Sequence, residues 1–146
     1  MITHKASIMV RKPVADVFKF VCADYFTNHP KTDPRVVSLH LESSGPVAVG
    51  TRGQEVRKQG GRKVTYNFEV TEYVTNKLMA MKAKGGPAQF SAVYAVKAVN
   101  DKETELEIEF KLKMGGLLML IEPFMAGSFR KEVAGLCSRI KGMLET

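Results

Sequence analysis

A glutamate and an arginine two positions apart, Glu55 and Arg57, are the strongest candidates for chemistry in this chain. Either charge alone would be costly to bury in an apolar cavity, so the two side chains should pair with each other or with the polar end of a ligand. On this hypothesis Arg57 anchors a carboxylate or carbonyl group, and Tyr66 and Tyr94 donate hydrogen bonds. Glu122, from the last third of the chain, is a further candidate at the same site.

Apolar residues would form the rest of this expected ligand site. They are weak indicators by themselves, because such residues are apolar in any core. The alternative interpretation is that Glu55 and Arg57 pair at a cavity mouth or face solvent. The expected wall consists of Phe68, Phe90, Phe110, Met125 and Phe129.

The direction of the Glu55 and Arg57 side chains depends on a hairpin. Gly60-Gly61 separates two extended segments, and a two-residue turn there would place Arg57 opposite Val64 and Glu55 opposite Tyr66. The same register would place Gly53 opposite Phe68. The later strand must bury its apolar face, so Gly53, Glu55 and Arg57 would point inward. A loop one residue longer would turn Val56 inward instead.

Metal and nucleophile motifs are missing from the sequence. His4, His29 and His40 are far apart, and there is no HxH, HExxH, GxSxG, Walker or GxGxxG pattern, so we expect neither a metal nor a cofactor. Cys22 and Cys137 lack CxxC spacing and occupy apolar positions of expected helices. They are interpreted as buried, reduced thiols.

Length and charge favour a single globular domain, residues 1–146, in the cytoplasm. The formal charge of +7 is spread singly along the expected strands, which indicates a solvated surface, and no nucleic-acid partner is expected. The first residues have no signal-peptide pattern, and Leu117 to Met125 is too short to span a bilayer. The oligomeric state is left open.

Hydrophobic periodicity places two short helices after a first strand, and then further strands. The second helix should end at His29, because Pro30 follows. Val37, Leu39 and Leu41 alternate with polar residues in the next strand, which predicts that the strand is half-buried with these three residues inward. The expected elements are a strand at Thr3 to Arg11, helices from Val14 and at Tyr25 to His29, and strands at Val37 to Leu41, Thr51 to Gln59, Val64 to Val70, Leu78 to Lys84, Phe90 to Val96 and Glu105 to Met114.

The last third carries a helical stripe of apolar residues, with charges on the other side. Upstream residues continue this stripe, and Pro123 either kinks the helix or begins it. Sequential strands with short turns predict a curved antiparallel sheet of about seven strands, in an α+β fold, that closes over this C-terminal helix and leaves a cavity. The stripe consists of Leu118, Ile121, Met125, Phe129, Val133, Leu136, Cys137, Ile140, Met143 and Leu144.

The order of these segments and several short motifs resemble the START/Bet v 1-like (SRPBCC) superfamily, in its polyketide cyclase/dehydrase and lipid transport branch. The motifs are Pro13-Val14-Ala15-Asp16-Val17-Phe18, Gly45-Pro46 through Val49-Gly50-Thr51, and Val70-Thr71-Glu72-Tyr73. The resemblance implies a helix-grip domain whose cavity holds an apolar or amphipathic small molecule such as a lipid, quinone or polyketide. Relatives commonly carry an aromatic residue where Gly53 stands and a Trp before the pair that appears here as Asp33-Pro34.

Three functions follow as hypotheses. The leading one is binding or transport of a small hydrophobic or amphipathic ligand. The rival is an aromatase/cyclase-type enzyme in which Arg57, Glu55 or a tyrosine assists proton transfer. The third is an interaction protein that uses its basic surface at a membrane or ribosome.

Overall fold

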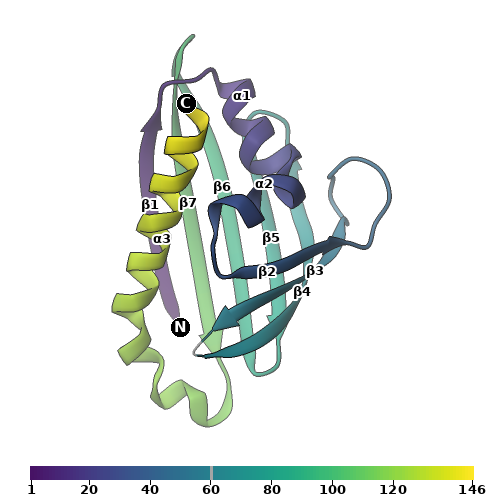
Figure 1. Cartoon of the computed structure of the whole chain (residues 1–146), viewed down its shortest axis with the longest axis vertical. Coiled ribbons are helices and arrows are strands. Elements are labelled where there is room, and N and C mark those ends of the chain that lie inside the picture. Colours follow the sequence, from purple (N-terminus) through teal and green to yellow (C-terminus); the bar gives the residue numbers. More distant parts are fainter. Residues whose placement is uncertain (60) are drawn as a thin grey trace.

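The computed structural model describes residues 1–59 and 61–146 and contains a seven-stranded antiparallel sheet (Figure 1). Every neighbouring pair of strands is antiparallel, and the spatial order is β1-β7-β6-β5-β4-β3-β2. The strands are β1 Ile2–Val10, β2 Val36–Leu41, β3 Arg52–Gln59, β4 Arg62–Val74, β5 Leu78–Gly85, β6 Ala88–Asn100 and β7 Glu103–Met114.

Helices cover the inner face of this sheet (Figure 1). The long helix α3 (Glu122–Leu144) packs mainly along β1 and also contacts β7. The short helices α1 (Val14–Phe18) and α2 (Tyr25–Thr32) are joined by a π-helical turn, η1 (Lys19–Ala23), and a 3-10 turn, η2 (Gly116–Leu120), precedes α3. The predicted α+β arrangement, with two short helices after the first strand and one long C-terminal helix, is confirmed.

Alternation along β7 places one face of the sheet in the core. Thr104, Leu106, Ile108, Phe110, Leu112 and Met114 are buried, whereas their neighbours are at least partly exposed. From α3 the residues Val133, Leu136, Cys137 and Ile140 pack into the same core. Cys22 and Cys137 are buried free thiols, as predicted.

The hairpin register is the one that the two-residue turn predicted. Glu55 pairs with Tyr66, Arg57 with Val64 and Gly53 with Phe68. The turn prediction itself falls partly on Gly60, which lies outside the described residues. The paired strands fix the facing of the side chains, because an offset of one residue would reverse it.

Two local predictions about element ends and facing were wrong. Helix α2 continues through Pro30 to Thr32, where the backbone N–H of Asp33 and the Thr32 hydroxyl both donate to the His29 carbonyl. Val37 is exposed rather than inward, because β2 changes register between Val36 and Ser38. An irregularity of this kind leaves one residue out of the alternation.

The predicted stripe of the last third is correct in its centre and wrong at two positions. Helix α3 begins at Glu122, with Pro123 in its first turn, so Ile121 precedes the helix and is exposed. Met143 is also exposed, because it lies at the edge of the face centred on Ile140 and Leu144. Within residues 1–59 and 61–146, no helix has the length and apolar character needed to cross a membrane.

Candidate functional site

A cavity of about 560 Å³ lies between the inner face of the sheet and helices α2 and α3. Aromatic and aliphatic side chains form most of its wall. Phe90 stacks on Phe110 at a centroid distance of 5.1 Å, and Phe110 meets Phe129 of α3 edge to face at 6.1 Å. The strands contribute Phe68, Met81, Ala83, Phe90, Phe110 and Leu112, and α3 contributes Phe124, Met125, Phe129, Val133 and Leu136.

All but two of the predicted site residues line this cavity. The exceptions are Gly53 and Glu122. Gly53 is buried beside the wall, and a Cβ there would lie 2.5 Å from Phe68 Cζ and 2.7 Å from the His40 carbonyl oxygen. Glu122 is buried at the start of α3, where it pairs with the amino group of Met1 and accepts a 3.3 Å hydrogen bond from the Met114 backbone N–H.

A cluster of charged side chains occupies one part of the otherwise apolar wall. Arg57 is at its centre and donates from Nη1 to Glu55 Oε1 at 3.2 Å and from Nη2 to Asp33 Oδ2 at 3.1 Å. Glu55 comes from β3, whereas Asp33 follows the end of α2 and also accepts a 3.1 Å hydrogen bond from the Arg35 backbone N–H. The cluster therefore joins the helical layer to the sheet.

His29 completes this cluster on the α2 side. Its Nε2 lies 3.8 Å from Glu55 Oε1 and 3.9 Å from Asp33 Oδ2, which are distances for electrostatic contact rather than hydrogen bonds. Its ring stacks on Tyr25 at a centroid distance of 4.6 Å. Burial lowers the pKa of His29 to about 4, although Asp33 acts in the opposite direction, so the imidazole is neutral at pH 7.

Burial also shifts the two partners of the central ion pair. Loss of solvation raises the pKa of Glu55, and the nearby Arg57 only partly offsets it. Burial opposes the charge of Arg57 as well, but Glu55 and Asp33 outweigh that effect and raise the pKa of Arg57. The guanidinium is therefore permanently charged, while Glu55 takes up a proton more readily than a glutamate in water.

Two tyrosines that line the cavity differ in whether their hydroxyl groups have a hydrogen-bond partner. Tyr66 donates a 2.7 Å hydrogen bond to Gln59 Oε1. The Tyr94 hydroxyl is buried and has no hydrogen-bond partner among the residues that the structure describes. Burial raises the pKa of Tyr94 far above its usual range, so this hydroxyl keeps its proton and remains a donor. An unpaired buried hydroxyl is costly, and a ligand could satisfy it.

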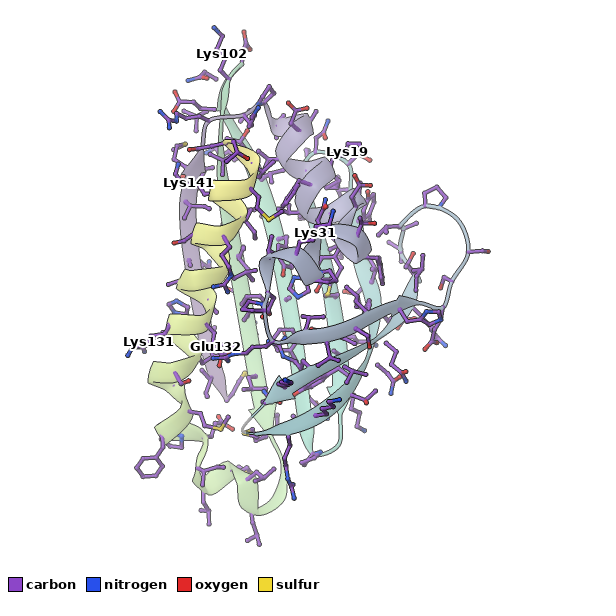
Figure 2. The ribbon with its side chains drawn as sticks, in the orientation of Figure 1. Lys19, Lys31, Lys102, Lys131, Glu132 and Lys141 are labelled. Carbon is purple, nitrogen blue, oxygen red and sulfur yellow. The ribbon has the colours of Figure 1, made fainter. Side chains whose placement is uncertain are left out.

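An ion pair between Arg35 and Glu132 bridges the cavity wall from the α2–β2 connection to α3. Figure 2 shows Glu132 on the side of α3 that faces β2, and Lys131 on the other side. Lys58 and Phe124 line the same cavity and are exposed. These exposed lining residues mark the mouth, between the end of β3 and the first turns of α3.

Sequence reasoning missed most of the helical contribution to the cavity. Tyr25, His29 and Asp33 are spaced by four residues, which places them on one face of a helix, and this spacing is the signal that could have found them. Their meeting with Glu55 and Arg57 is a long-range contact that no local pattern encodes. Over residues 1–59 and 61–146, no group of three or more His, Cys, Asp or Glu side chains is arranged to hold a metal ion.

A second hollow of about 680 Å³ lies on the outer face of the sheet. It is an open groove, lined largely by charged and polar side chains such as Arg52, Lys82 and Lys113. Few of its residues are buried. The aromatic cavity between the sheet and the helices is the better candidate for a small-molecule site, because such sites are mostly apolar with a few convergent polar groups.

Comparison with known families gives one match that spans nearly the whole chain. Residues 1–141 match the family described as polyketide cyclase/dehydrase and lipid transport. No curated protein matches the sequence.

Solved structures resemble this one over almost their full lengths. A START superfamily protein from Mycobacterium smegmatis has a TM-score of 0.81 at 11% identity, with 98% of this chain and 97% of that chain covered. The Zhui aromatase/cyclase from a Streptomyces species has a TM-score of 0.79 at 10% identity, covering 98% and 93%. Ara h 8.0201 has a TM-score of 0.74 at 15% identity, covering 97% and 96%. At these identities the likeness shows the fold alone.

Proposed function

The chain belongs to the polyketide cyclase/dehydrase and lipid transport family and has the helix-grip fold of Bet v 1-like proteins, and from this premise we propose that it binds or transports an amphipathic small molecule. The ligand lies in the cavity between the sheet and α3. Its apolar body contacts the phenylalanine wall, and its polar end contacts the cluster around Arg57 and Tyr94.

One observation carries this proposal: a cavity of about 560 Å³ between the sheet and the helices has an aromatic wall and a buried polar cluster. Ligand pockets are typically roughly 300–1,000 Å³ in volume and have this composition. A space of this kind inside a core costs stability, because its lining loses packing contacts. A bound apolar molecule would restore those contacts.

The proposal can be tested with an uncharged fluorescent probe. Phenylnaphthylamine should bind with increased fluorescence and at one site. Replacing Ala83, which lines the cavity between Phe68 and Phe90, by phenylalanine should weaken binding at least about tenfold, because the new ring fills the cavity. Equal binding by both proteins, or none by the parent, would contradict the proposal. Native mass spectrometry of protein purified from its own host would then give the mass of a bound ligand.

A second candidate function is supported by the charged cluster. Burial moves the pKa of Glu55 upward and that of His29 downward, and such groups beside a cavity suit general acid and base catalysis. An aromatase/cyclase is among the structurally similar proteins. Turnover of a poly-β-ketone substrate that falls at least about a hundredfold in Glu55→Gln would support this activity. Unchanged turnover in Glu55→Gln and in Arg57→Lys would exclude a role for the cluster.

We also propose a cytoplasmic location. Cys22 and Cys137 are buried free thiols, which is compatible with a reducing compartment. Fluorescence microscopy of the tagged protein in its host would test this.

A further inference from the structure

The guanidinium of Arg57 already has two acidic partners. Glu55 Oε1 and Asp33 Oδ2 lie 3.2 Å and 3.1 Å from its two terminal nitrogens. Both carboxylates are buried, and the Arg57 side chain is 15% exposed. An arginine paired in this way is a poor anchor for a third carboxylate, because the incoming anion would have to displace one acid and leave it buried and unpaired.

The charge of the cluster points in the same direction. Arg57 supplies one positive charge, and Asp33 and Glu55 supply two acidic groups. His29 adds no positive charge at pH 7, because burial keeps its imidazole neutral. The cluster is therefore negative when Glu55 is ionised and uncharged when Glu55 is protonated. In neither state does it attract an anion.

The Tyr94 hydroxyl supplies a second and independent observation. Tyr94 is only 2% exposed, lines the cavity, and has no hydrogen-bond partner among the described residues. Tyr25 packs against its ring edge to face at 5.8 Å. A ligand hydroxyl that reaches this buried oxygen could accept a hydrogen bond from Tyr94 and donate one to a carboxylate of the cluster, whereas an ionised ligand carboxylate has no proton to donate.

The other charges of the cavity lie at its mouth. Arg35 is paired with Glu132, and Lys58 is exposed to solvent. An anionic head group held at Lys58 would remain in water and gain little. The buried cluster, not the mouth, therefore decides which polar end is accepted.

Resting on the ligand-binding function proposed above, we propose that the buried end of the cavity selects an uncharged hydroxyl, as in an alcohol or phenol, and rejects the same skeleton ending in a carboxylate. Glu55, Asp33 and Tyr94 are the residues that set this preference, and Arg57 holds the two acids in place. This differs from the role of carboxylate anchor that the sequence suggested for Arg57.

Competition between dodecanol and dodecanoate tests this preference, with phenylnaphthylamine as the displaced probe. At about pH 8, where the fatty acid is ionised, dodecanol should displace the dye at a concentration at least about tenfold lower than dodecanoate does. Glu55→Gln removes one acid and keeps the shape of the side chain. The ratio of the dodecanoate concentration to the dodecanol concentration that displaces the dye should therefore fall several-fold. Glu107→Gln, on the outward face of β7, is the matched control and should keep the parent ratio.

Tyr94→Phe provides a second variant, which removes an unpaired hydroxyl from the core without creating a buried charge. This variant should bind dodecanol more weakly, so the concentrations of dodecanol and dodecanoate that displace the dye should become more similar. If dodecanoate displaces the dye as well as dodecanol does, the hydroxyl preference is overturned while the ligand-binding function stands. If the dye itself fails to bind, the ligand-binding function falls and the preference falls with it. If the ratio of displacing concentrations is unchanged in both Glu55→Gln and Tyr94→Phe, these residues do not set the preference for a hydroxyl.

Discussion

Gly53 shows how one residue shapes the layers around the cavity without lining it. A side chain there would meet Phe68 at 2.5 Å, the His40 backbone at 2.7 Å and Phe26 at 2.8 Å. Phe26 and Phe68 stack with centroids 5.2 Å apart directly beside this glycine. The absence of a side chain at Gly53 therefore allows α2 to approach the sheet, and α2 carries His29 and leads into Asp33.

Gly53→Ala should lower the free energy of unfolding by about 1–3 kcal/mol, because the added methyl overpacks a site bounded partly by backbone. Gly127→Ala is the matched control, since a Cβ at Gly127 in α3 meets nothing within 4 Å. That replacement should raise stability by up to about 1 kcal/mol through helix propensity. Urea denaturation of both variants measures the difference, and equal effects would contradict the close packing described at Gly53.

The buried imidazole of His29 should make stability depend on pH. Its pKa is about 4 in the folded protein, below its ordinary value of 6.5, so the unfolded chain binds more protons between these values. The stabilising contribution is complete above about pH 6.5 and is lost as the pH falls to about 4. Stability measured across this window should fall more steeply in the parent than in His29→Gln. If the plots of stability against pH are parallel for the parent and for His29→Gln, His29 does not titrate as described.

The sequence predicted the strand side of the polar cluster and missed its helical side. Glu55 and Arg57 could be placed inward because the apolar alternation of Val64, Tyr66 and Phe68 fixes the hairpin register. His29 and Asp33 could not be placed, since the rotation of a short helix is set by its packing and not by its own residues. The cluster exists only after α2 docks.

At the scale of elements, α3 is held to the sheet by the centre of its apolar stripe. Ile140 is 3% exposed and belongs to the main core, whereas Met143, three residues later, is 39% exposed. At the helix end, Glu145 accepts hydrogen bonds from the Arg11 backbone and from Lys141. The C-terminal half of α3 therefore anchors the helix, while the N-terminal half forms the cavity wall.

Ile140→Ala should destabilise the fold by about 2–5 kcal/mol, because it removes buried apolar volume from the core. Met143→Ala removes a side chain of similar size from an exposed position and should change stability by no more than about 0.5 kcal/mol. Thermal unfolding of the two variants would make the comparison. Similar losses in both would mean that α3 packs through a different face.

Local signals at the ends of elements were overridden by tertiary contacts. Pro30 removes one backbone donor from α2, yet the helix continues to Thr32, whose carbonyl accepts a hydrogen bond from Arg139 of α3. In β2 the change of register after Val36 could not be inferred from alternation, because the apolar residues Val37, Leu39 and Leu41 keep a perfect period of two. Both features are consequences of packing between distant parts of the chain.

At the scale of the whole molecule, most charged side chains lie on the surface and the apolar core lies between the sheet and the helices. The formal charge of +7 is carried mainly by exposed lysines and arginines, whereas Asp33, Glu55 and His29 are buried around Arg57, and Glu122 is buried separately at the start of α3. The fold itself was predictable, because consecutive antiparallel strands and one long amphipathic helix permit few arrangements. The polar content of the cavity was not, because it depends on which side chains of separate layers meet.

The central claim is that a small-molecule ligand binds between the sheet and α3. Proton–nitrogen correlation spectra of the labelled protein, recorded during titration with dodecanol, test it most directly. If the ligand binds there, the largest amide shifts should occur at lining residues of the inner face and of α3, such as Tyr94, Phe110 and Val133. Shifts confined to the outer groove, at Lys82, Lys84 and Lys113, would contradict it.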